Sequence, residues 1–168
     1  FQQSLGSIAD KSSRVAGLAA TLAAPAQADP TIVARAAELA KTDLVTEMVG
    51  EFPELQGVMG GYYAREEDEP AGVADAIVEH YAPAAAGAPI AVSPAGRALA
   101  LADRLDTLAG IFAIDKRPSG DKDPFGLRRA ALGVLRTLIE SGMRVDLAAL
   151  IEQAIAAQPI EAAADTKA

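Results

Sequence analysis

Two acidic residues interrupt a strongly apolar run. The segment LALADRLDTLAG, residues 99–110, consists mostly of leucine and alanine and carries Asp103 and Asp106. Its leucines recur at three- and four-residue spacing, but Asp103 lies on another face, so the helix is apolar nearly all round and should be central. A buried carboxylate is costly unless it is paired. The sequence therefore predicts that Asp103 is buried beside a cation or a metal ion.

Two other segments could supply the partner. KSSRVAGLA begins at Lys11, and LAKTDL contains Thr42 and Asp43, with Asp43 four residues after an apolar leucine. We expect Lys11 to pair with Asp43, with Asp103 or with both. The alternative is that Lys11 and Asp103 are ordinary surface charges. Asp106 lies three residues after Asp103, a spacing that puts it near the same face of the helix. Its partner stays open among Arg104, Arg14 and a loop amide.

These segments together resemble the HD superfamily of metal-dependent phosphohydrolases, which is all-helical and binds a divalent metal through a first His, a His-Asp pair and a distant Asp. The resemblance puts Lys11 and Thr42 at the two His positions, while Asp43 and Asp103 keep the acids. Two aspartates facing a lysine are a poor cation site. The resemblance thus implies a degenerate pocket without metal or catalytic residues. The alternative is an active HD phosphohydrolase acting on a nucleotide-like substrate.

Other catalytic motifs are missing from the sequence. It has no cysteine, no phosphate-binding GKS or GKT loop and no GxSxG motif, and His80 is its one histidine. A lone histidine near a helix end is typically structural or exposed, with a functional role as the alternative. The absence of cysteine excludes disulfides and favours a reducing, cytoplasmic setting.

Composition indicates one all-α domain. The chain has 168 residues, 51% of them hydrophobic and only 4% aromatic, with alanine in excess. Such composition favours helices over sheets. The apolar periodicity predicts about seven helices in a domain of residues 1–157, followed by a frayed tail at 158–168. We expect no membrane span, because no run of about 18 apolar residues is free of charge, and no signal peptide. The start at Phe1 suggests a piece of a longer protein.

Capping residues predict where the helices begin and end. One helix should start at Asp29-Pro30 and continue, after a bend, to Gly50, and a short one should follow from Pro53. Later helices are expected from Ser93 to Ile114, from Asp123-Pro124 onward, and from Asp146 to Ala157.

The charge is unevenly distributed. The net charge is −8 with a pI near 4.6, which argues against a free-standing nucleic-acid binder. Residues 42–92 hold one base against ten acids, whereas residues 104–144 hold eight bases and five acids. A local contact with nucleic acid through the second region stays open.

A longer set of segments carries a closer resemblance. KTDLVTEMVGEFPELQGVMGGYYA, VADAIVEHYAP, LADRLDTLAGIF and DPFGLRRAALGVLR, in order between Phe1 and Leu150, resemble the β subunit of the heterotetrameric bacterial glycyl-tRNA synthetase. They correspond to its internal HD-like domain, ahead of a region that resembles an anticodon-binding domain.

This resemblance implies a function. The parent enzyme joins glycine to tRNA using ATP and Mg²⁺, and its active site and these cofactors belong to the α subunit. The present chain should hold no cofactor and be catalytically silent alone, contributing scaffold and a tRNA-facing surface. The implied partners are other β-subunit domains, the α subunit and tRNA, with no membrane. A pure interaction domain without RNA contact is a further alternative.

One basic segment could provide the tRNA surface. It comprises loop residues Lys116, Arg117 and Lys122 and helix residues Arg128, Arg129 and Arg136. Loop amides, helix starts and guanidinium groups all favour phosphate. The alternative is a solvated helix face in which Arg136 pairs with Glu140.

The segment GEFPELQGVMGGYYA has a different character. We expect Phe52, Leu55 and Met59 to pack in the core, with a contact to another domain of the subunit as the alternative. Its acidic surroundings make RNA binding there unfavourable.

Overall fold

The structure is a computed structural model that describes residues 2–160. Within these residues it is all-helical, which confirms the predicted class, with eight α-helices rather than seven and three 3₁₀ helices. The only ladder contact in this part is an isolated bridge in a turn, between Ser119 and Lys122. The elements are η1 (Gln3–Leu5), α1 (Ile8–Ala23), α2 (Pro30–Leu39), η2 (Thr42–Val45), α3 (Glu47–Glu51), η3 (Pro53–Leu55), α4 (Val58–Glu66), α5 (Ala71–Glu79), α6 (Pro94–Ala113), α7 (Leu127–Ser141) and α8 (Leu147–Ala156).

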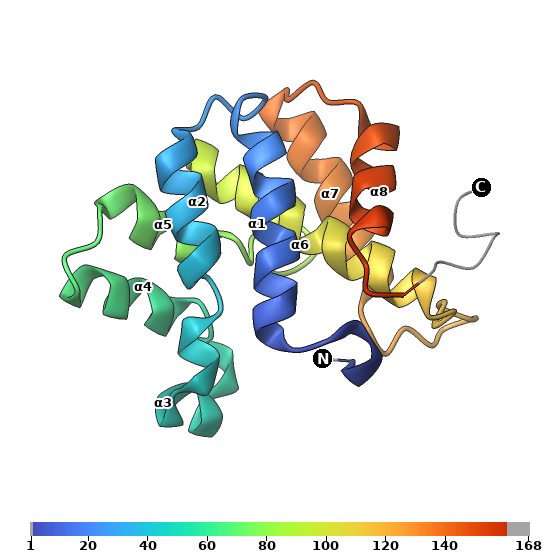
Figure 1. Cartoon of the computed structure of the whole chain (residues 1–168), viewed down its shortest axis with the longest axis horizontal. Coiled ribbons are helices and arrows are strands. Elements are labelled where there is room, and N and C mark those ends of the chain that lie inside the picture. Colours follow the sequence, from blue (N-terminus) through green and yellow to red (C-terminus); the bar gives the residue numbers. More distant parts are fainter. Residues whose placement is uncertain (1, 161–168) are drawn as a thin grey trace.

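Helix α6 is the central element of the bundle. It packs against α1, α2, α5, α7 and α8, and Figure 1 shows it running behind α1. Leu99 and Leu101 on this helix are at most 1% exposed. The prediction of a central helix from its nearly all-round apolar pattern is therefore confirmed.

Most predicted capping residues act as caps. The Asp29 carboxylate accepts from the Thr31 amide at 2.8 Å, Ser93 Oγ from Gly96 at 2.9 Å, and Asp146 from Ala149 at 3.0 Å. These side chains satisfy backbone donors that the first helical turn leaves unpaired.

Helix α7 begins three residues later than Asp123-Pro124 predicts. Its N-cap is Gly126, whose φ of 65° lies in the left-handed region that glycine adopts without strain. Asp123 still serves the helix start, since its two carboxylate oxygens accept from the Leu127 and Arg128 amides at 2.8 and 2.9 Å.

The helix expected from Asp29-Pro30 to Gly50, with a bend on the way, is divided into three separate elements. Helix α2 stops at Leu39, and the chain turns through η2 before α3. The Thr42 hydroxyl donates to the Leu39 carbonyl at 2.8 Å, and Thr46 Oγ1 both donates to the Asp43 carbonyl and accepts from the Val49 amide. These local side-chain bonds compete with helix continuation. Because of this break, Lys41 is buried in the bundle while Thr42 is exposed.

Phe52 does not lie in the core, contrary to expectation. Its side chain is 50% exposed, and Leu55 and Met59 are only partly buried. The segment from η2 to α4 forms an edge of the bundle far from α7 and α8 (Figure 1). The alternative, a contact with another domain, stays a prediction.

The chain stays folded slightly beyond the expected domain end. Gln158, which we expected to be the first frayed residue, is buried and donates to Asp106 Oδ1 and to the Ala154 carbonyl. The rest of the expected tail, from 161 onward, lies outside the described residues. Among the described helices, none is both long and apolar enough to cross a bilayer.

Candidate functional site

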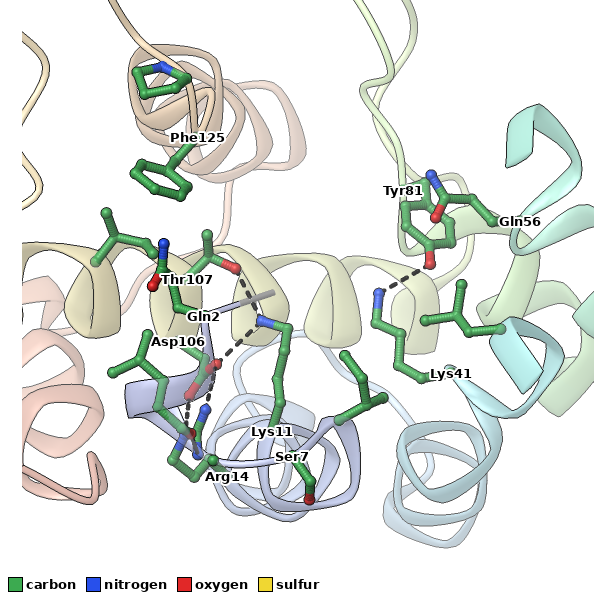
Figure 2. A pocket seen from close by; sticks show the side chains of 16 residues that line it. Gln2, Ser7, Lys11, Arg14, Lys41, Gln56, Tyr81, Asp106, Thr107 and Phe125 are labelled. Atoms are coloured by element: carbon green, nitrogen blue, oxygen red, sulfur yellow. Dashed lines mark hydrogen bonds and ion pairs between the residues drawn. The ribbon is translucent and has the colours of Figure 1, made fainter. Parts of the chain in front are cut away.

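A cluster of partly to fully buried ion pairs joins three elements at the middle of the bundle. It consists of Lys11 and Arg14 from α1, Lys41 from the turn after α2, and Asp103 and Asp106 from α6. We call these five residues the ion-pair cluster. Figure 2 shows Lys11 and Lys41 approaching α6 from two separate elements. The cluster brings together parts of the chain that are about 90 residues apart in sequence.

Lys11 lies where the sequence predicts a cation. Its Nζ is 3.2 Å from Asp103 Oδ1 and 3.0 Å from Asp106 Oδ2, and it donates to Thr107 Oγ1 at 2.9 Å. The expected pair with Asp103 is confirmed, and the surface-charge alternative is wrong for these two residues. Burial alone would lower the Lys11 pKa, but the two carboxylates raise it above its usual value.

Asp106 is the more deeply buried of the two carboxylates, with a side chain only 2% exposed. Arg14 Nε donates to its Oδ1 at 2.6 Å, and Gln158 Nε2 donates to the same oxygen at 3.1 Å. Arg14 also donates to the Leu5 carbonyl at 3.0 Å. Among the partners left open by the sequence, the structure thus selects Arg14, and it adds Lys11.

Asp103 is a strongly stabilised anion. Burial would raise its pKa, but the Lys11 and Lys41 ammonium groups hold it well below its usual value. The ion pair with Lys41 measures 3.4 Å from Nζ to Oδ1.

Lys41 is the member of the ion-pair cluster that the sequence did not predict. Its Nζ is 2.7 Å from His80 Nε2 and 3.1 Å from the Tyr81 hydroxyl, and it lies 4.2 Å from the centre of the Tyr81 ring. Burial lowers the Lys41 pKa, which Asp103 partly offsets. Lys41 directly precedes Thr42 in the sequence, but its inward orientation becomes evident only from the turn that the chain makes after α2.

His80 is fully buried, as the structural interpretation predicted. Its Nδ1 lies 2.6 Å from the Ile77 carbonyl, which can only accept, so Nδ1 carries the proton and Nε2 accepts from Lys41. Burial, and then the nearby Lys41 ammonium, lower the His80 pKa to about 3. The imidazole is therefore neutral at physiological pH, and it serves as a hydrogen-bond acceptor for a buried ammonium.

Thr42 and Asp43 do not join the ion-pair cluster, contrary to the predicted pocket. Thr42 is exposed. Asp43 is fully buried, but its Oδ2 accepts from the Gly57 and Gly60 amides at 2.5 and 3.1 Å. A Cβ at position 60 would approach Asp43 Oδ2 to 3.2 Å and an Ile77 methyl to 2.8 Å. Asp43 therefore caps the start of α4, and of the two partners expected for Lys11 the structure selects Asp103 and not Asp43.

The donors in the cluster do not suit a divalent metal. Around Asp103 stand two ammonium groups, a tyrosine hydroxyl and one imidazole whose Nε2 is occupied by Lys41. Within the described residues, no group of three or more His, Cys, Asp and Glu side chains could hold a metal ion. A metal centre needs several oxygen or nitrogen ligands around one point, without competing cations.

A cavity of about 380 Å³ opens beside the cluster, lined by Lys11, Arg14, Lys41, Tyr81 and Phe125 among others. The three hydrogens of each lysine ammonium already face acceptors in the protein: Asp103, Asp106 and Thr107 for Lys11, and His80, Tyr81 and Asp103 for Lys41. The cations are consequently engaged internally, and they link α1 and the turn after α2 to α6.

The predicted basic segment lies on the surface at the start of α7. Lys116, Arg117, Lys122, Arg128 and Arg129 are all exposed. Arg128 Nη2 donates to the Gly120 carbonyl at 2.7 Å, and Arg117 pairs with Asp115 at 3.2 Å. The expected phosphate-binding amides at the start of α7 are already taken by Asp123, so only side chains are offered to a phosphate there.

Arg136 lies further along α7 in a different situation. Its Nε donates to Glu140 Oε1 at 2.6 Å, the pair that we weighed as the alternative to phosphate binding. This four-residue pair stabilises the helix surface only slightly.

The fold and the cluster define a class of protein: an all-helical domain organised around internal Lys–Asp and Arg–Asp ion pairs. The chain matches the family model described as glycyl-tRNA synthetase beta subunit over residues 1–168. It is 56% identical to the glycine–tRNA ligase beta subunit of Chromohalobacter salexigens over 93% of its length, and 54% identical to that of Xanthomonas campestris over 95%. The protein of that name from Coxiella burnetii is 52% identical over 92% of the chain.

The chain belongs to the glycyl-tRNA synthetase beta subunit family. It spans only 22–23% of the length of these relatives. The resemblance drawn from the sequence segments is therefore confirmed at the level of the family.

Proposed function

We propose that this chain is a non-catalytic, HD-like module of a glycyl-tRNA synthetase β subunit, contributing scaffold and a tRNA contact to the glycylation of tRNA. The observation that carries the proposal is the convergence of Lys11 and Lys41 on Asp103. Positive charge that a metal would supply in an HD pocket is supplied here by two ammonium groups. In this proposal ATP and Mg²⁺ act in the α subunit, and the enzyme is cytoplasmic.

The non-catalytic part of the proposal can be tested with metal. Because the ammonium groups occupy the space around Asp103, we expect about 1 mM Mn²⁺ to leave the melting temperature unchanged, as a ligand that does not bind the native state gives no linkage. Metal analysis of the purified protein and a phosphatase assay with Mn²⁺ complete the measurement. Stoichiometric metal, or hydrolysis that disappears in an Asp103→Asn variant, would favour an active phosphohydrolase.

The tRNA contact is proposed for the exposed bases between Lys116 and Arg129. This segment contains five basic residues and two acidic residues, Asp121 and Asp123. The Asp123 carboxylate already accepts hydrogen bonds from amides at the start of α7. Arg128 is anchored to the loop at Gly120, which holds its guanidinium in place and lowers the entropic cost of a bidentate phosphate contact.

A double substitution in the intact synthetase tests this contact. We expect Arg128→Ala with Arg129→Ala to weaken tRNA binding about tenfold at low salt and to reduce the salt dependence by about one to two phosphate contacts. The measurement is a tRNA titration across a salt series.

A matched control removes two charges elsewhere. Arg35→Ala with Arg65→Ala changes the net charge equally, on the acidic side of the molecule, where both arginines pair with acids. This control should leave tRNA affinity nearly unchanged. If the two double variants weaken tRNA binding equally, the effect comes from net charge and not from a contact at Arg128 and Arg129. If Arg128→Ala with Arg129→Ala does not weaken binding, the proposed contact is wrong.

A further inference from the structure

The outer face of α7 carries an unpartnered apolar stripe. Leu132, Leu135 and Ile139 follow one another at three and four residues, and they are 60%, 46% and 77% exposed. The opposite face of the same helix is also apolar: Leu127 and Val134 are buried, and α7 packs there against α6. A helix that is apolar on both faces is normally covered on both. We call Leu132, Leu135 and Ile139 the outer stripe.

The chemistry of the outer stripe does not suit RNA. Protein–RNA contacts are dominated by charged and polar groups on phosphate and sugar and by aromatic side chains on bases. The stripe offers three aliphatic side chains, and Arg136 beside it is already paired with Glu140. Aliphatic side chains at this spacing are instead the usual anchors of helix–helix contacts between proteins.

The length of the family members indicates where this partner is. The chain spans 22–23% of its relatives, so most of a β subunit lies outside residues 1–168. A segment of the same polypeptide is present at an effective concentration that no separate molecule matches. We propose that the outer stripe is the docking site of a segment of the same β subunit outside residues 1–168, apolar along the face that contacts Leu132, Leu135 and Ile139.

This inference is independent of the tRNA contact proposed above. It concerns aliphatic side chains that the arginine substitutions leave in place, and its test measures thiol protection rather than tRNA affinity. The two proposals can therefore fail separately.

Cysteine labelling in the full-length β subunit tests the docking. Residues 1–168 contain no cysteine, so Ile139→Cys and, as a second variant, Leu135→Cys each introduce one reporter into this part of the chain. Both sites are exposed in the domain, so neither change should disturb its folding. Labelling by a thiol reagent is followed at the peptide level by mass spectrometry, and each native rate is divided by the rate in denaturant.

The control is Val92→Cys, since Val92 is 79% exposed and so nearly matches Ile139. We expect labelling at positions 135 and 139 to be slowed about tenfold or more in the β subunit alone, while position 92 is slowed much less. Rapid labelling of both stripe positions would overturn the proposal. Protection that appears only after the α subunit or tRNA is added would also overturn it, because the occupant would then be that molecule.

Discussion

Replacing Asp106 by asparagine is expected to lower the free energy of unfolding by about 3–5 kcal/mol. The asparagine side chain has nearly the same shape, but it cannot neutralise Lys11 and Arg14, which both contact Asp106. Because the Asp106 side chain is only 2% exposed, water has little access to this position to solvate the cations left without their counter-charge. Urea denaturation of the wild-type chain and the Asp106→Asn variant, at constant pH and salt, measures the loss.

A surface aspartate provides the control for this prediction. Asp115 also pairs with an arginine, Arg117, but its side chain is 75% exposed. Asp115→Asn should change stability by less than about 1 kcal/mol. If Asp106→Asn is as mild as this control, the cluster cations must leave the interior easily, and the cohesive role of the ion pairs would be wrong.

Replacing both partners should be less damaging than replacing one. In Arg14→Met with Asp106→Leu, the buried charges of that pair disappear together, although Lys11 then keeps only Asp103. Removing matched buried charges in favour of apolar side chains is often close to neutral. The double variant should therefore cost less than the sum of the two single changes, which a double-mutant cycle measures directly.

The Lys11–Asp103 contact could be predicted because two independent signals agreed. An acid interrupted a nearly all-apolar helix, so it needed a buried cation, and the HD resemblance pointed to a lysine at a ligand position. The central place of α6 followed from the same periodicity. The central place of α6 depends on spacing within a single helix, where the periodicity fixes the geometry. The Lys11–Asp103 contact joins two helices, so it needed the resemblance to indicate the partner.

The lysine at position 41 could not be predicted in the same way. Whether Lys41 or Thr42 faces inward depends on how the chain turns after Leu39. That turn is fixed partly by Asp43, which binds the amides of Gly57 and Gly60. Hydrogen bonds between segments more than ten residues apart leave no local pattern, so the phase of the helix could not be carried through the break.

Phe52 and the outer stripe show a second limit of pattern reading. Apolar residues at helical spacing predict a covered face, but the same pattern arises from a core and from a contact with a further segment. In the described part of the chain Phe52 and Ile139 are exposed, although nothing in their spacing separates them from buried residues such as Val134. The pattern predicts that an apolar face is covered, but it does not tell whether the core of the same domain or a further segment covers it.

Lowering the pH from 6.5 to 4.5 is expected to destabilise the chain by about 2–3 kcal/mol through His80 alone. The His80 pKa is about 3 in the folded chain and near 6.5 when unfolded. Between these two pKa values the unfolded state binds a proton at His80 and the folded state does not. The free energy of unfolding therefore falls by up to about 1.4 kcal/mol for each unit by which the pH is lowered. Asp103, whose folded pKa is depressed, loses its contribution only below its unfolded pKa of about 3.9.

The matched variant is His80→Gln, which does not titrate and whose side-chain carbonyl can still accept from Lys41. Its stability at pH 7 should be lower, because the packing and the Ile77 contact change, but its slope between pH 6.5 and 4.5 should be nearly flat. Urea denaturation at several pH values gives both slopes. The same slope in both proteins would show that another group takes up the proton. A flat wild-type slope would mean that a protonated His80 is accepted beside Lys41, against the role of His80 Nε2 as the acceptor from Lys41.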